Sequence, residues 1–244
     1  MNPELRTTIM KLLEKSELQQ TLINQATKAL NLCHVMEEFK NTTARIESEK
    51  LLLLYGLRKN ACLSEMRRLL ALEHHPNKSW EDADITLEGI SLRIKEVPMR
   101  SEIYNKDHAE WFVVMITQGS NVIATQAVQC PILCSKLHFP LSLTLHNLQS
   151  DFNIDVEIYS LKIENSNYNQ NVKSHTLKNG PRPHRPTSFW KRSGGKTRTS
   201  LRNIDSTVRE TSFTLCGRIN FMIHDLAETK TVHKLNSVSF ISYF

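Results

Sequence analysis

The sequence is poor in glycine and cysteine and has no long apolar run, and each of these scarcities argues against a class of protein. Its seven glycines form neither a glycine-rich phosphate loop nor a nucleophile elbow, and no paired-carboxylate signature is present. No stretch of about 18 apolar residues occurs, so no membrane-spanning helix is expected. The five cysteines are odd in number and widely spaced, which gives no disulfide framework. We therefore expect a protein that is not an enzyme, needs no cofactor and does not depend on disulfides.

The first residues, MNPELRTTIMKLLEK, also lack the character of a secretory signal, because charges are spread through a helical pattern. An intracellular location is therefore expected, in which the thiols stay reduced. With 40% hydrophobic residues over 244 positions, the chain can build one large domain or two small ones. The thiols are those of Cys33, Cys62, Cys130, Cys134 and Cys216.

Acidic residues are missing altogether between Glu164 and Asp205, and this gap carries the positive charge of the chain. Nine of the 31 basic residues lie in it, so that 22 remain elsewhere against 25 acidic residues. The formal net charge of +6 therefore belongs to one segment, and the rest of the chain is mildly acidic. The nine are Lys173, Lys178, Arg182, Arg185, Lys191, Arg192, Lys196, Arg198 and Arg202.

Two long amphipathic segments open the chain, from about residue 3 to 36 and from about residue 43 to 73. Apolar or small residues recur along the first at alternating four- and three-residue steps, which predicts a helix with one narrow apolar seam. The second repeats the pattern and is broken only at Lys59. Two such helices with a short polar connection predict an antiparallel hairpin over residues 1–75. The seam positions are Leu5, Ile9, Leu12, Ser16, Gln19, Ile23, Ala26, Leu30 and Cys33, then Leu52, Tyr55, Lys59, Cys62, Met66 and Leu69.

From about residue 84 the apolar period becomes two, which predicts strands. The parity of the pattern changes across Gly89, and a glycine at such a change indicates a β-bulge. The strands follow one another with no helix between them, and Asn153, Asp155 and Glu157 are expected on a wet face. One-sided alternation favours an antiparallel β-sandwich over residues 84–244, so the predicted fold class is α+β. The clearest runs are 111–118, 122–129, 139–145, 152–158, 213–223 and 232–244.

The acid-free segment is expected to interrupt the sandwich as a long disordered loop over residues 165–204. It has three prolines, a glycine pair and few large apolar residues, so it cannot bury enough surface to offset the entropy cost of ordering. Polybasic segments gain about 1 kcal/mol per charge near an anionic membrane, and Phe189 and Trp190 suit the lipid interface. The same residues can stack on nucleic-acid bases, and a solvated linker is the third interpretation.

Three groups of potential metal or catalytic ligands are better explained as structural residues. Cys130, Cys134 and His138 lack the close paired spacing of zinc sites, so buried thiols are expected. His74 and His75 fall at a helix C-terminus, where histidines cap the helix. Some lipid-binding sandwiches gather aspartates at one rim to hold calcium, but here they are sparse and fit solvated strand ends. These aspartates are Asp82, Asp84, Asp151 and Asp155.

A leucine run over residues 51–54 covers a full turn of the second helix, whereas a two-helix hairpin buries only one stripe. This turn should therefore contact something else, either the sandwich or a partner. Glu47 and Glu49 precede it, and the small residues Ala26 and Ala29 lie across the hairpin. Small residues let another backbone approach closely, and the glutamates could meet basic residues of a partner. These positions form a candidate partner-binding face.

Several stretches resemble the C-terminal region of the anillin family of cytokinetic scaffolds. They occur in the same order over nearly the whole chain, and together they are fairly specific. Rhotekin-like proteins share the architecture and are the nearest rival. The stretches are QQTLINQATKALNLC (residues 19–33), ESEKLLLLYGLRKNACLSEMRRL (47–69), ITLEGISL (85–92), DFNIDVEIYSL (151–161) and, more weakly, TSFTLCGRINF (211–221).

The resemblance implies a hairpin that binds a Rho-family GTPase in its GTP form. It also implies a sandwich related to calcium-dependent lipid-binding domains, without their metal site, that contacts anionic phosphoinositide membrane. A link to septins and a place at the cell cortex and contractile ring are implied as well. The GTPase face would comprise Ala26, Ala29, Leu30, Glu47, Glu49 and Leu53. The membrane contact would comprise Lys173, Lys178, Arg182, Arg185, Trp190, Lys191, Arg192, Lys196, Arg198 and Arg202.

The sequence departs from the family pattern at both ends. Members usually continue into a pleckstrin-homology domain, whereas this sequence ends at Phe244. No actin- or myosin-binding region precedes the hairpin, so we expect a fragment or a shortened relative.

The expected function is an adaptor that joins two weak contacts, one to the GTPase and one to lipid, through effective concentration. We expect no nucleic acid and no small-molecule substrate as partners. The alternatives are a nucleic-acid-binding protein that uses the same loop and a structural protein whose hairpin pairs with a second copy.

Overall fold

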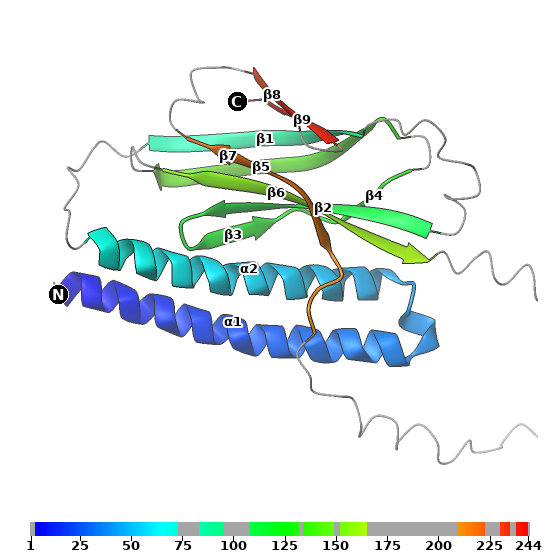
Figure 1. Cartoon of the computed structure of the whole chain (residues 1–244), viewed down its shortest axis with the longest axis horizontal. Coiled ribbons are helices and arrows are strands. Elements are labelled where there is room, and N and C mark those ends of the chain that lie inside the picture. The colour runs from blue at the N-terminus through cyan, green and yellow to red at the C-terminus, as the bar shows by residue number, and fades with distance from the viewer. Residues whose placement is uncertain are drawn as a thin grey trace, which may run out of the picture.

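The computed structural model describes residues 3–72, 83–94, 108–131, 134–148, 152–164, 209–222, 230–234 and 238–243. In this part of the chain a helical hairpin lies against two antiparallel sheets, which confirms the α+β class (Figure 1). The hairpin consists of α1 (Pro3–Val35) and α2 (Thr43–Leu72), joined through the short 3-10 helix η1 (Glu37–Phe39). The acid-free segment lies outside the described residues, as do His74, His75, Asp82 and Asp151.

The predicted seam holds the two helices together. Two apolar clusters fill it, one towards the closed end of the hairpin and one towards its open end, because residues three and four apart share one side of a helix. Neither helix is both long and apolar enough to cross a membrane. The buried members of the clusters are Ile23, Ala26, Leu30 and Leu52 at the closed end and Leu12, Cys62 and Met66 at the open end.

The sheet far from the hairpin, which we call sheet A, has the order β5-β1-β9-β8. Its strands are β5 (Lys136–Leu148), β1 (Ala83–Ile94), β9 (Val238–Tyr243) and β8 (Lys230–Lys234). The register between β1 and β5 shifts between Glu88 and Ile90, and Gly89 has a φ of 62°. The β-bulge predicted at this glycine is therefore confirmed.

The sheet next to the hairpin, sheet B, has the order β3-β2-β6-β7, and β4 also pairs with β2. Its strands are β2 (His108–Gln118), β3 (Asn121–Ala124), β4 (Val128–Gln129), β6 (Ile154–Glu164) and β7 (Thr214–Phe221). The hairpin expected around Gly119 is present, with Gln118 paired to Asn121.

The run expected over residues 122–129 is broken into two strands. β3 ends before Thr125, whose hydroxyl accepts a hydrogen bond from the Val114 amide at 3.0 Å. The Thr125 amide donates to the Val114 carbonyl at 2.9 Å, so the side chain of one residue replaces a bond that a regular strand would make with its backbone.

The main apolar core lies between the two sheets and follows the predicted alternation. A second core lies between sheet B and α2, to which Leu53 and Leu54 contribute together with Val113, Met115 and Leu161. The leucine turn of α2 therefore packs against the sandwich, the first of the two contacts weighed for it. Fully buried residues of the main core include Leu92, Phe139, Ile154, Ile158 and Phe221.

The prediction of a wet face on sheet B holds for Asn153, which is exposed, but is wrong for Glu157, because α2 covers that part of the face. Residues 112–116 of β2 are buried without alternation, and Glu157 on β6 is only 3% exposed. A hydrogen bond from the Arg58 guanidinium to the Val122 carbonyl, at 2.9 Å, also ties α2 to the sheet. Figure 1 shows the resulting order of layers: α1, α2, sheet B and sheet A.

Candidate partner-binding surface

The six side chains predicted for the GTPase face do not share one surface. Ala26 and Leu30 are buried in the hairpin seam, Leu53 is buried against sheet B, and Glu49 is 0% exposed. Side chains enclosed by their own chain cannot contact a partner in this conformation. The seam and the sandwich take up the sides of the helices on which these four lie, and a role for them in a GTPase contact stays a prediction.

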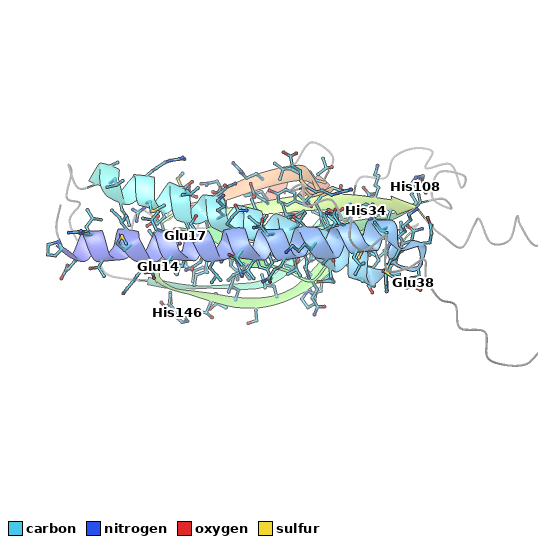
Figure 2. The ribbon with its side chains drawn as sticks, turned by 90° about the horizontal axis from the view of Figure 1, so that it is seen from below. Glu14, Glu17, His34, Glu38, His108 and His146 are labelled. Atoms are coloured by element: carbon cyan, nitrogen blue, oxygen red, sulfur yellow. The ribbon has the colours of Figure 1, made fainter. Side chains whose placement is uncertain are left out.

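Ala29 and Glu47 are the two members of the set that are exposed. Ala29 lies on α1, one position before the buried Leu30, so it borders the seam from outside. The Glu47 carboxylate pairs with Lys50 on the same helix at 2.6 Å and is 51% exposed. Figure 2 looks at the hairpin from below, where α1 lies in front and Glu14 and Glu17 line its exposed side.

Glu49 is held by a segment far away in the sequence. The Ser212 amide donates to Oε2 of Glu49 at 2.7 Å, and the Ser212 hydroxyl donates to Oε1 at 2.7 Å. The Thr211 hydroxyl lies 3.2 Å both from Oε2 and from the backbone carbonyl of Glu49. Because these donors replace water around the carboxylate, its burial is tolerated.

His34 lies near this group, in the last turn of α1. Burial lowers the pKa of its imidazole below the ordinary 6.5, and the positive charges of Arg45, Arg209 and Lys40 lower it further, against an opposing effect of Glu49. A cationic histidine normally suits a helix C-terminus, but the crowd of basic neighbours here favours the neutral ring.

A second polar group lies under the other half of α2. The Glu157 carboxylate accepts hydrogen bonds from the Arg218 guanidinium, with Nε at 2.7 Å, and from the Tyr159 hydroxyl at 2.9 Å. Burial, reinforced by the nearby Glu157 carboxylate, raises the pKa of Tyr159. A cleft of about 530 Å³ opens beside the group, and Glu65 and Arg68 pair with each other in its wall at 2.8 Å.

The potential metal ligands singled out in the sequence have other contacts. The thiols of Cys130 and Cys134 lie 3.5 Å and 3.0 Å from the carbonyls of Pro131 and Lys136, respectively. Nδ1 of His138 lies 3.3 Å from the Ser91 hydroxyl. Among the described residues, no three His, Cys, Asp or Glu side chains are grouped closely enough to hold a metal ion.

The aspartates at the strand starts also have partners. Asp84 pairs with His146 across β1 and β5 at 2.8 Å. Asp155 accepts a hydrogen bond from the side-chain amide of Asn220 at 2.9 Å.

Sequence reasoning did not find Thr211 and Ser212 as partners of Glu49. Both residues fall in the stretch that resembles the anillin family most weakly. Two hydroxyl residues before a strand also give no indication of a contact with a distant segment. The charged Glu49 at a position within an otherwise buried turn was the available indication, because buried carboxylates require donors.

Known proteins match both parts of this architecture. The family described as cell division protein anillin matches residues 81–226. Anillin of Drosophila melanogaster is 31% identical over 169 residues, which are 68% of this chain and 14% of that protein. Anillins of Mus musculus and Homo sapiens are each 27% identical over 92% of this chain, which spans 21% of their length. Since the family model matches more than half of the chain, including most of the sandwich, and these relatives match 92% of it, the chain belongs to the anillin family.

Proposed function

We propose that this chain is a non-enzymatic adaptor in cell division that binds a Rho-family GTPase in its GTP form on the helical hairpin and anionic phosphoinositide membrane on the basic segment. The observation that carries the proposal is the exposed side of α1. Because α2 is enclosed between α1 and sheet B, α1 offers one long helical surface on a rigid base. Membership of the anillin family supports the same assignment.

The GTPase contact is centred on Ala29 and Glu47 in this proposal. Ala29 has no side chain beyond Cβ, so a partner backbone can approach the end of the seam closely. Glu47 supplies a negative charge that a basic residue of the partner can pair with, in competition with Lys50. Ala26, Leu30 and Leu53 hold the two helices and the sheet in position beneath this surface.

In this proposal the described residues that flank the basic segment bring the membrane contact towards the closed end of the hairpin. The basic segment follows β6, which ends at Glu164, and it precedes Arg209, whose charge acts on His34. His108 of β2 lies opposite Glu164 of β6 in the strand register. Figure 2 shows His108 at the same end of the molecule as His34. Lipid held by this segment would therefore lie beside the GTPase surface, at the cell cortex and contractile ring, where septins are further proposed partners.

GTPase binding is tested by titrating the full chain with a Rho GTPase loaded with a GTP analogue or with GDP. We expect binding only to the GTP form, and Ala29→Asp should weaken it at least tenfold because it places a charge in a closely packed contact. Ala71→Asp is the matched control, since Ala71 is also exposed but lies at the far end of α2. Equal affinity for both nucleotide forms, or wild-type affinity of Ala29→Asp, would overturn the assignment.

Membrane binding is tested by flotation with vesicles that contain or lack phosphoinositide. We expect binding only to the anionic vesicles, with affinity that falls as salt rises and on replacing the nine basic residues by alanine. Binding that ignores these replacements would contradict the proposal. A gel shift with RNA or DNA at physiological salt, stronger than vesicle binding, would favour nucleic acid instead.

A further inference from the structure

Glu49, Thr211 and Ser212 form a fastening between the hairpin and the chain that leads into β7, and we call these three residues the latch. Glu49 is fully buried although it is a glutamate, and every donor to its carboxylate comes from a segment 162 or 163 residues away. The latch therefore joins α2 to Thr211 and Ser212, which come a few residues after the basic segment in the sequence.

Polar and apolar contacts both act at this junction. The Phe213 amide donates to the Thr211 hydroxyl at 3.2 Å, and the Phe213 side chain is buried in the core between α2 and sheet B. Opening the latch would leave a buried carboxylate without donors, so the closed arrangement is strongly favoured. This holds as long as the Ser212 side chain is uncharged and keeps its hydroxyl hydrogen.

Ser212 is the residue at which this balance can be reversed. Its hydroxyl oxygen is 2.7 Å from Glu49, yet the residue is exposed, and residues 209–213 belong to neither helix nor strand. A phosphate on that oxygen would remove the donated hydrogen and add a charge of about −1.5 to −2 beside the carboxylate. Arg45 and Lys40 lie near His34 at the closed end of the hairpin, so released phosphate would find cations on the hairpin surface.

We infer that Ser212 is a phosphorylation site and that its modification opens the latch, releasing residues 209–213 from the hairpin. This inference rests on the proposed function in one respect. In the proposed function one partner binds the hairpin and the other binds a segment that ends a few residues before the latch, so binding of lipid and of GTPase should each strengthen the other while the latch is closed. Opening it leaves both contacts possible and removes their coupling.

The latch itself is tested by hydrogen exchange of the full chain, with phosphoserine incorporated at position 212 and with Ser212→Glu as a mimic. We expect exchange of the amides in residues 209–216 and in the first half of α2 to rise at least tenfold, with β1 and β5 unchanged. Thr214→Glu is the matched control because Thr214 is exposed two residues further on. Wild-type exchange in the phosphoserine protein, or an equal rise with Thr214→Glu, would overturn the latch.

The charge dependence is tested by adding Glu49→Gln to the Ser212→Glu protein. A glutamine amide can donate to the new carboxylate and no longer repels it, so we expect the exchange rates to return to within about threefold of those of Glu49→Gln alone. Ser212→Ala loses one donor without adding charge and should raise exchange only a few-fold. If Ser212→Ala opens the segment as far as Ser212→Glu does, repulsion is not the cause and the inference fails.

The coupling is tested by measuring GTPase affinity with and without phosphoinositide vesicles. We expect vesicles to tighten GTPase binding at least fivefold for the wild type and not for Ser212→Glu, while the affinity for GTPase alone changes less than twofold. Unchanged coupling in Ser212→Glu would overturn this part. If the wild type binds neither GTPase nor vesicles, the proposed function fails, whereas the exchange experiments still decide whether the latch exists.

Discussion

Lys59 donates a hydrogen bond to the Gln20 side-chain carbonyl across the hairpin at 2.7 Å, and this pair accounts for the one break in the apolar seam of the second helix. The two residues are on opposite helices, between the two apolar clusters of the seam. A polar pair at one level of an apolar interface favours a single register, because a shifted helix would leave both groups without partners.

Removing one member of this pair should destabilise the hairpin more than removing both. Gln20→Leu leaves the partly buried Lys59 ammonium without its acceptor, at a cost of about 1–3 kcal/mol in the free energy of unfolding. Gln20→Leu with Lys59→Leu should recover most of that loss, because two apolar side chains then meet in the seam. Urea denaturation followed by circular dichroism measures the three proteins, and additive losses would contradict the pairing.

The sequence predicts the hairpin and most strands because these depend on local periodicity. The seam of α1 and α2, the bulge at Gly89 and the turn at Gly119 each follow from residues close together in the chain. The covering of sheet B by α2 does not. Asn153, Asp155 and Glu157 alternate with apolar residues as a solvent-facing row would, and Asn153 is exposed, but the packing of a distant helix buries Glu157.

The candidate site divides in the same way. Ala29 and Glu47 remain exposed as predicted, while Glu49 is two residues from Glu47 and faces the opposite environment. Successive residues of a helix differ by about 100° in direction, so nearby glutamates cannot be assigned to one face from sequence spacing without knowing what covers each side. The contact of Thr211 with Glu49, which explains why Glu49 is buried, exists only in the folded protein.

The contact between Glu157 and Arg218 should be essential to the second core. Arg218→Ala leaves a carboxylate that is nearly fully buried with Tyr159 as its remaining donor among the bonds described here. We expect a loss of about 1–3 kcal/mol in the free energy of unfolding, because the buried carboxylate loses a donor, although the Arg218 side chain itself is 59% exposed. Glu157→Gln with Arg218→Met should lose less, because neither charge remains. Urea unfolding decides, and a larger loss in the double variant would contradict this account.

Three glycines should respond to alanine in different directions. Gly56 lies inside α2 and an added Cβ meets no atom within 4 Å, so Gly56→Ala should stabilise the protein by about 0.5–1 kcal/mol. Gly119 has a φ of 54° and an added Cβ would reach Glu65 only at 3.8 Å, so strain alone should cost about 1 kcal/mol. Gly89→Ala should cost more, because its φ is 62° and the new Cβ would lie 3.2 Å from His138. Thermal unfolding of the three variants gives the order, and stabilisation by Gly89→Ala would show that the bulge relaxes.

The stability of the hairpin should depend on the protonation of His34. Burial, together with the charges of Arg45, Arg209 and Lys40, lowers the pKa of this ring in the folded protein below the unfolded value of 6.5. The unfolded chain therefore binds more protons in this range, and the free energy of unfolding should fall as the pH decreases from 6.5 through the folded pKa. Above that range the protonation of His34 should have no effect.

His34→Gln should remove this part of the pH dependence. Chemical denaturation at intervals between about pH 7.5 and 5 gives the difference in stability between wild type and variant, which should shrink or change sign as the pH falls, because only the wild type must exclude a proton on folding. His146→Gln is the control, since His146 lies on the exposed face of sheet A, far from the basic cluster at the closed end of the hairpin. A difference between wild type and His34→Gln that is constant across this range would show that the basic neighbours do not act on the ring.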